Sequence, residues 1–264
     1  MTILDRIVED KIGEVTAAAR KVSEADLRKR IADEPWEARG FERRLAAPGP
    51  GGVNIIAEVK RASPSKGDIC AGLDAARCAA QYEAGGAAAV SVLTDQRYFK
   101  GSLDDLRRVR ETVALPVLRK EFIISPYQVY ESRAAGADAV LLIVRILPAS
   151  QLKDLLDLTQ SLGMDALVEI HSEEDYPVAQ QACARLIGIN NRNLATFDTS
   201  VATAMALRAR FSAEEIPVAA SGIGGREDIE SNLRAGIFNF LIGESLVRAE
   251  DREGFLRTLV FGHD

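Results

Sequence analysis

The sequence predicts an α/β protein whose strands close into a single (β/α)8 barrel, preceded by a helical extension. Eight short apolar segments alternate with amphipathic helical patterns from Val53 to the end of the chain. Several of these segments are apolar at consecutive positions, as expected for parallel strands covered on both sides. Each strand-helix unit takes about 26 residues, which fits a barrel of roughly 250 residues.

The predicted strands share a length of four to eight residues, and in chain order they are Val53–Lys60, Ala87–Leu93, Pro116–Lys120, Ala137–Val144, Met164–Ile170, Leu186–Asn190, Pro217–Ser221 and Phe238–Ile242. The helices predicted between them, before a short tail helix, are Leu73–Glu83, Ser102–Thr112, Pro126–Ala135, Ala149–Leu162, Glu173–Cys183, Thr199–Arg210 and Glu227–Ala235. Glycine follows many of these helices, in the segments EAGGA, AAGAD, SLGMD and RAGIF. Glycine in that place is the usual left-handed cap.

Residues 1–52 differ from the rest of the chain. An apolar stripe with helical spacing predicts one amphipathic helix, and it comprises Ile3, Leu4, Ile7, Val8, Ile12 and Val15. Ser23 is the expected N-cap of a second helix, and Pro48–Gly52 is a turn-rich break. We therefore expect an N-terminal helical extension over 1–52 and the barrel over 53–264, in one structural domain.

The alternative fold is an open doubly wound sheet. That fold carries a glycine-rich fingerprint after its first strand. The first strand here ends instead in Glu58-Val-Lys60-Arg-Ala-Ser-Pro. The sequence thus favours the barrel.

Composition excludes several classes of partner. The chain has 33 basic and 39 acidic residues, a net charge of −6, which gives no global attraction to nucleic acid or anionic lipid. Its longest strongly apolar run, Ala139–Val144, is far shorter than the roughly 20 residues that span a bilayer. The three cysteines cannot all pair, and the N-terminus lacks the apolar stretch of a signal peptide. We expect a cytoplasmic protein with no nucleic-acid or membrane partner.

Charged and amide side chains end several predicted strands. Glu58 and Lys60 end the first strand and share one face of it, Lys120 ends the third, Glu169 the fifth and Asn190 the sixth. Barrel active sites form at these carboxyl ends, and charged groups inside a barrel rim need a reason. We predict that two lysines and two carboxylates converge there. Lysines interleaved with the acids would repel a cation, so no metal site is expected.

The last two strand ends carry glycine. Ser221-Gly222 and Gly243-Glu244 each precede a predicted helix, and such loops are the usual phosphate site of barrels. The residues together indicate a small phosphorylated substrate. A lysine facing a carboxylate suits proton delivery to a carbonyl oxygen or, equally, a Schiff base. His171 comes just after Glu169 and is expected to face away from it, in a supporting role.

Motifs at nearly every strand end resemble those of the indole-3-glycerol-phosphate synthase family, and the resemblance covers essentially the whole chain in order. The matching segments are Ala57–Gly67, Ser91–Thr94, Tyr98–Ser102, Leu118–Ile123, Leu167–His171, Ile187–Leu194 and Phe240–Ser245. The resemblance implies a barrel with an N-terminal helical extension near the active site.

The resemblance also implies a carboxy-lyase of tryptophan biosynthesis that needs no organic cofactor and no metal. The implied sugar-phosphate substrate is 1-(2-carboxyphenylamino)-1-deoxyribulose 5-phosphate. Its carboxylate-bearing ring carbon attacks the ribulose carbonyl, CO₂ leaves, and loss of water gives the indole.

Matched motif by motif, the resemblance assigns roles to residues of this chain. Lys120 would be the acid that protonates the carbonyl oxygen, and Glu169 the base of the dehydration. Lys60 would hold the anionic groups or act as a second acid, Glu58 would orient the lysines, and Asn190 would bind the sugar hydroxyls. The substrate would be bordered by Phe99, Phe122, Arg192 and Ser221. Its phosphate would be bordered by Ser63, Gly222, Gly243 and the backbone N–H of Glu244. The division of acid and base work among Lys60, Lys120, Glu58 and Glu169 stays open.

One position departs from the family pattern. Where the family has Glu-Ser-Gly-Ile on the seventh strand, this chain has Ala220-Ser221-Gly222-Ile223. Loss of an anion there should lower the pKa of a neighbouring lysine and leave a gap. We expect activity lower by on the order of 10²-fold or more, or redirected to a modified anthranilate-derived substrate.

Other functions stay open beside this one. The first is an aldolase that forms a Schiff base through Lys120 or Lys60. The second is a phosphate-ligand binding protein, or pathway partner, that has lost its chemistry at Ala220. The sequence also leaves open a homo-oligomer or a complex with another enzyme of the pathway.

Overall fold

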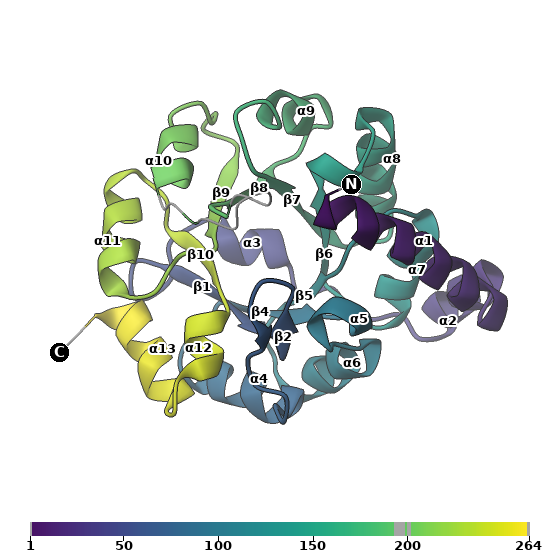
Figure 1. The fold of residues 1–264 in the computed structure, drawn as a ribbon, viewed down its shortest axis with the longest axis horizontal. Helices are drawn as coiled ribbons and strands as arrows, with labels where there is room; N and C mark the ends of the chain where they lie inside the picture. Colours follow the sequence, from purple (N-terminus) through teal and green to yellow (C-terminus); the bar gives the residue numbers. More distant parts are fainter. Residues whose placement is uncertain (1, 193–198, 200–201, 263–264) are drawn as a thin grey trace.

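Eight parallel strands close into a barrel in the computed structural model, which describes residues 2–192, 199 and 202–262 (Figure 1). The barrel strands are β1 (Asn54–Val59), β4 (Ala89–Leu93), β5 (Val117–Lys120), β6 (Ala139–Ile143), β7 (Asp165–Ile170), β8 (Leu186–Asn190), β9 (Ile216–Ala220) and β10 (Asn239–Ile242). Each pairs in parallel with its neighbours along the chain, and β10 closes the ring on β1. The predicted (β/α)8 barrel is confirmed.

Helices surround this ring, as Figure 1 shows. They are α4 (Ala75–Ala84), α6 (Leu103–Thr112), α7 (Pro126–Ala134), α8 (Ala149–Ser161), α9 (Tyr176–Gln181), α10 (Ala202–Arg208), α11 (Arg226–Arg234), α12 (Glu244–Arg248) and α13 (Arg252–Phe261). The glycine caps predicted after four helices have positive φ, at Gly86, Gly136, Gly163 and Gly236. Only glycine adopts that conformation without a steric cost.

Two predicted helices, α9 (Tyr176–Gln181) and α10 (Ala202–Arg208), are shorter in the structure by several residues. Helix α9 begins three residues later than expected, because the Asp175 carboxylate accepts the backbone N–H groups of His171 and Ser172 and holds a turn ahead of it. Helix α10 begins at Ala202, and most of the preceding segment lies outside the described residues, as do Asn193 and Leu194 of the motif Ile187–Leu194.

The extension contributes three helices. Helix α1 (Ile3–Lys21) is capped by Thr2, and α2 (Glu24–Asp33) by Ser23 as predicted, whose Oγ accepts the Asp26 N–H at 3.1 Å. The sequence did not indicate α3 (Phe41–Leu45). Its Phe41 and Leu45 pack with the residues that point into the barrel, so α3 fills the N-terminal end of the ring (Figure 1).

Short elements above the strands were also missed by the sequence patterns. A hairpin of β2 (Ala62–Ser63) and β3 (Gly67–Asp68) follows β1, while α5 (Gln96–Phe99) follows β4 and η1 (Val144–Ile146) follows β6. Elements of two to four residues leave no periodicity to read. They shape the carboxyl end of the barrel, where the predicted site residues lie.

Among the described residues, no helix is both long and apolar enough to cross a membrane.

Candidate active site

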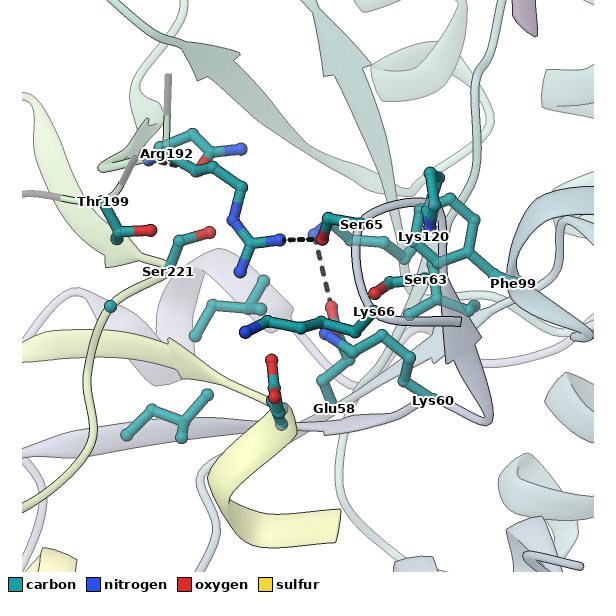
Figure 2. A pocket seen from close by; sticks show the side chains of 18 of the residues that line it. Glu58, Lys60, Ser63, Ser65, Lys66, Phe99, Lys120, Arg192, Thr199 and Ser221 are labelled. Carbon is teal, nitrogen blue, oxygen red and sulfur yellow. Dashed lines mark hydrogen bonds and ion pairs between the residues drawn. The ribbon is translucent and has the colours of Figure 1, made fainter. Parts of the chain in front are cut away.

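A cavity of about 710 Å³ opens at the carboxyl ends of the strands. Every residue that the sequence indicated for the site lines it, together with Ile3, Leu4 and Ile7 of α1. Figure 2 shows part of this lining, with Glu58, Lys60 and Lys120 labelled. The lining residues predicted from sequence are Glu58, Lys60, Ser63, Phe99, Lys120, Phe122, Glu169, Asn190, Arg192, Ser221, Gly222, Gly243 and Glu244. Strand alternation places the charged ones on the inward face. The sequence thus located the residues of one cavity, whereas their roles are a separate question.

Glu58 is the anionic centre of the cavity. Its carboxylate lies 2.7 Å from Lys60 Nζ and 3.3 Å from Lys120 Nζ, and only 3% of the residue is exposed. Burial alone would raise the pKa of Glu58, but the two ammonium groups outweigh it and hold this pKa at about 2. Glu58 is therefore ionised at neutral pH.

Lys120 stays protonated in this setting. Burial favours its neutral amine, but the charges of Glu58 and Glu169 overcome that effect and raise the pKa of Lys120 above its ordinary value. Lys120 therefore carries a proton at neutral pH.

Glu169 lies in the same cavity. Asn190 Nδ2 donates to its Oε1 at 3.2 Å, and His171 Nε2 lies 3.2 Å from the same oxygen. Burial would raise the pKa of Glu169, but the contact with His171 and the charge of Lys120 hold it at about 2. The prediction that His171 faces away from Glu169 is wrong, because residues two apart along a strand share a face and His171 directly follows β7.

The last two strand ends show close packing and strained backbone. Ser221 has φ +67° and Gly222 φ +77°, and a serine in that region costs conformational energy. At Gly243 a Cβ atom would lie 2.4 Å from Glu58 Oε1, so any side chain there would displace the Glu58 carboxylate from its present position. These loops precede α11 and α12, as predicted.

Ser63 comes from the β2–β3 hairpin. It is 6% exposed, and its hydroxyl makes no hydrogen bond within the described part of the chain. A buried polar atom without a partner is costly unless a ligand satisfies it. The hydroxyl and the glycine loops offer neutral donors to one cavity.

Two aromatic rings and one arginine complete the walls. Phe99 and Phe122 have ring centroids 6.1 Å apart and planes tilted by 42°. Arg192 Nη1 donates to Ser65 Oγ at 2.9 Å and so joins the loop after β8 to the hairpin after β1 (Figure 2).

Ala220 lies on the inward face of β9. It pairs in register with Asn190 on one side and Leu241 on the other, and packs among the inner barrel residues at 3% exposure. A longer side chain at this position would extend toward the floor of the cavity.

Sequence reasoning missed a buried lysine that ties α1 to the barrel. Lys11 is 4% exposed, and its Nζ lies 2.8 Å from Asp95 and 3.0 Å from Glu121. These acids outweigh burial and raise the pKa of Lys11 further above its ordinary range. Glu121 also lines the cavity, so the same ion pairs hold α1 in place as one of its walls. Lys11 sits within a helical stripe of mixed character, and nothing in that pattern singles it out.

No cluster of His, Cys, Asp and Glu suited to a metal ion occurs among the residues that the structure describes. The fold and the cavity are those of a (β/α)8-barrel enzyme. Its site combines ionised lysine and glutamate side chains with uncharged hydroxyl and backbone N–H groups.

Comparisons with known proteins narrow this class. The sequence model of indole-3-glycerol phosphate synthase matches residues 4–259. An indole-3-glycerol phosphate synthase of Desulfosudis oleivorans is 59% identical over 258 residues, covering 98% of each chain. That of Syntrophobacter fumaroxidans is 51% identical over 256 residues, covering 97% of this chain and 96% of the relative.

Solved structures with this architecture are more distant in sequence. The α subunit of tryptophan synthase from Legionella pneumophila superposes with a TM-score of 0.61 at 14% identity, covering 84% of this chain and 97% of that one. A thiamine phosphate pyrophosphorylase from Pyrococcus furiosus gives 0.59 at 14% identity, covering 82% and 95%. These likenesses show the fold alone.

The chain belongs to the indole-3-glycerol phosphate synthase family, a family of decarboxylating carboxy-lyases in tryptophan biosynthesis.

Proposed function

We propose that this protein converts 1-(2-carboxyphenylamino)-1-deoxyribulose 5-phosphate into indole-3-glycerol phosphate, CO₂ and water. One observation carries the proposal: a single cavity presents Lys120, Glu169 and a set of neutral phosphate donors. Family membership supports the reaction type. The cavity volume of about 710 Å³ lies within the range of small-molecule sites.

The protonation states of the two central residues match the chemistry. As the carboxylate-bearing ring carbon attacks the ribulose carbonyl, the forming alkoxide needs a proton, and Lys120 carries one at neutral pH. Loss of CO₂ then leaves the hydroxylated ring, and its dehydration needs a base. Glu169 is ionised at neutral pH, so its carboxylate is in the state that can accept this proton.

The remaining side chains suit binding. Lys60 lies beside Glu58 at the rim and is placed to hold an anionic group of the substrate. Asn190 offers amide groups to the sugar hydroxyls, while Phe99 and Phe122 offer apolar surface to the aromatic ring. Arg192 steadies the rim through Ser65. Ser221 borders the substrate from the strained turn after β9.

The phosphate would lie among Ser63, Gly222, Gly243 and the N–H of Glu244. The unsatisfied hydroxyl of Ser63 and the glycines that admit close approach of backbone N–H groups support this assignment. A carboxylate repels an anion, so only the backbone N–H of Glu244 could bind the phosphate, and the carboxylate itself pairs with Arg248 at 3.1 Å.

The Schiff-base alternative receives less support. It needs a neutral amine as nucleophile, and the pKa of Lys120 is shifted the opposite way. Treatment with borohydride in the presence of substrate distinguishes the two, since only the aldolase would leave a covalent adduct on a lysine.

Turnover tests the proposal directly. Incubation of the protein with the carboxyphenylamino-deoxyribulose phosphate should produce indole fluorescence and release one CO₂ per product. Substrate that binds and stabilises the protein against heat, yet gives no product at high enzyme concentration, would favour a binding protein instead.

We also propose a cytoplasmic location, on the basis of the cysteines. Cys70, Cys78 and Cys183 are all free thiols, which supports placing the protein in the reducing cytoplasm. Cell fractionation followed by detection of the protein checks this.

A further inference from the structure

The cations of the cavity are not all neutralised. Lys60 and Lys120 share Glu58, and Arg248 pairs with Glu244. Lys66 also lines the cavity, and within the described residues no carboxylate lies within 4.0 Å of its ammonium group. An uncompensated lysine on a cavity wall is placed to receive an anion.

The hairpin that carries Lys66 has a defined geometry. Strands β2 and β3 pair Ser63 with Gly67, and the Lys66 N–H donates to the Ser63 carbonyl at 3.3 Å. Gly67 has φ +63°, the left-handed residue that closes a three-residue hairpin loop. The position of Lys66 relative to Ser63 is therefore set by the turn.

Both ends of this hairpin are tied down. At its base, Arg61 makes a two-point contact with Asp105 at 2.6 and 2.8 Å. At its tip, Ser65 accepts from Arg192 across the cavity mouth. Figure 2 shows the Lys66 side chain extending inward below this contact, toward the side of the cavity where Arg192 and Ser221 lie.

The phosphate donors assigned above are all neutral. A phosphate monoester carries a charge between −1 and −2 near pH 7, and hydroxyl or backbone donors supply no countercharge. Lys66 belongs to the same hairpin as Ser63, and its side chain extends toward the side of the cavity where Ser221 lies (Figure 2). Ser221 directly precedes Gly222, which also lines the cavity.

We propose that Lys66 is a substrate-binding residue whose ammonium group neutralises the phosphate held by Ser63 and the glycine loops. This assignment rests on the proposed function, and it adds a positive charge to a phosphate site whose other groups are uncharged. The hydrogen bond between Arg192 and Ser65 holds the tip of the hairpin, and the Lys66 ammonium group would approach the phosphate from the solvent side.

The test compares Lys66→Met with the wild type and with Lys66→Arg. Lys66 is exposed, so loss of its single charge contact should raise KM about tenfold and leave kcat nearly unchanged, and arginine should restore most of the affinity. Lys29→Met, an exposed lysine of α2, is the matched control and should change neither constant.

Product binding identifies the anion. Indole-3-glycerol phosphate keeps the phosphate but has lost the carboxylate, so Lys66→Met should weaken product binding by the same factor as it raises KM. Weakened substrate but unchanged product would assign Lys66 to the carboxylate and overturn the proposal, as would unchanged values for both. Failure of the proposed function itself would appear separately, as absence of turnover in the wild type.

Discussion

The two ends of the barrel are built from the same strands and serve different purposes. At the N-terminal end, Phe41 and Leu45 of α3 are fully buried and fill the ring. At the carboxyl end, the same interior opens into a cavity with Glu58, Lys120 and Glu169. One end is closed by packing, whereas the other holds charged groups in an open site.

Polar groups follow the same division. At the N-terminal end, Asn54 donates to Ala47 and Asn239, and Asp138 accepts from Arg39, Arg110 and Val117. Two buried atoms at this end, Arg110 Nε and Asn232 Oδ1, are exceptions that have no partner within the described part of the chain. At the carboxyl end, polar atoms of Ser63, Ser91 and Arg192 have no partner among the described residues. Most of the function therefore lies at the carboxyl end, where the backbone is strained and polar groups lack partners. The N-terminal end contributes mainly to stability, through its packing.

The largest effect should come from Lys120. Lys120→Met removes the proposed acid and should lower kcat by about 10³-fold, within the range of general-acid contributions. Glu58 keeps Lys60 as a partner, so the variant should still unfold cooperatively. Steady-state kinetics with thermal unfolding checks both, and a loss under tenfold would remove Lys120 from the acid role.

The opposite pattern should appear at the closed end. Phe41→Ala should destabilise the protein by about 3–5 kcal/mol by leaving a cavity in the barrel. Its kcat per folded molecule should stay close to wild type. Phe261→Ala, at a residue 53% exposed, is the control and should shift denaturant unfolding little. Equal effects of both variants would contradict the structural role of α3.

Ala220 lies at the boundary between the packed interior and the cavity. It packs among the inner barrel residues and pairs in register with Asn190 and Leu241, which line the cavity. Ala220→Glu should raise the catalytic rate about tenfold or more by adding an anion beside the lysines. Ala220→Gln, similar in size but neutral, should not do so. An unchanged rate in the glutamate variant would refute the view that this position limits activity.

The smallest expected effect concerns acid stability. The folded pKa of Glu58 is about 2, below its ordinary value of 4.5, so its ionisation contributes stability that is complete above about pH 4.5. That contribution is lost as the pH falls toward 2. Glu58→Gln should therefore lose less stability than wild type between pH 5 and 3, by chemical denaturation at each pH. Glu111→Gln, an exposed change on α6, should follow the wild-type curve.

The sequence predicted the long elements and the residues of the open end better than the closed end. Strand ends such as Lys120 and Glu169 were visible because charged residues interrupt apolar runs at the same place in each unit. Helix α3 and the β2–β3 hairpin were missed because a few residues set no period, and tertiary contacts define them. The contacts of Lys11 could not be predicted because its partner Asp95 is distant in sequence. The contact of His171 with Glu169 was missed because the sequence analysis placed the two side chains on opposite faces.

A structure of the protein with bound indole-3-glycerol phosphate tests the account most directly. The account predicts the phosphate among Ser63, Gly222 and Gly243, and the indole ring between Lys120 and Glu169. Product bound elsewhere on the molecule, or bound here without contact to either of those two side chains, would contradict it.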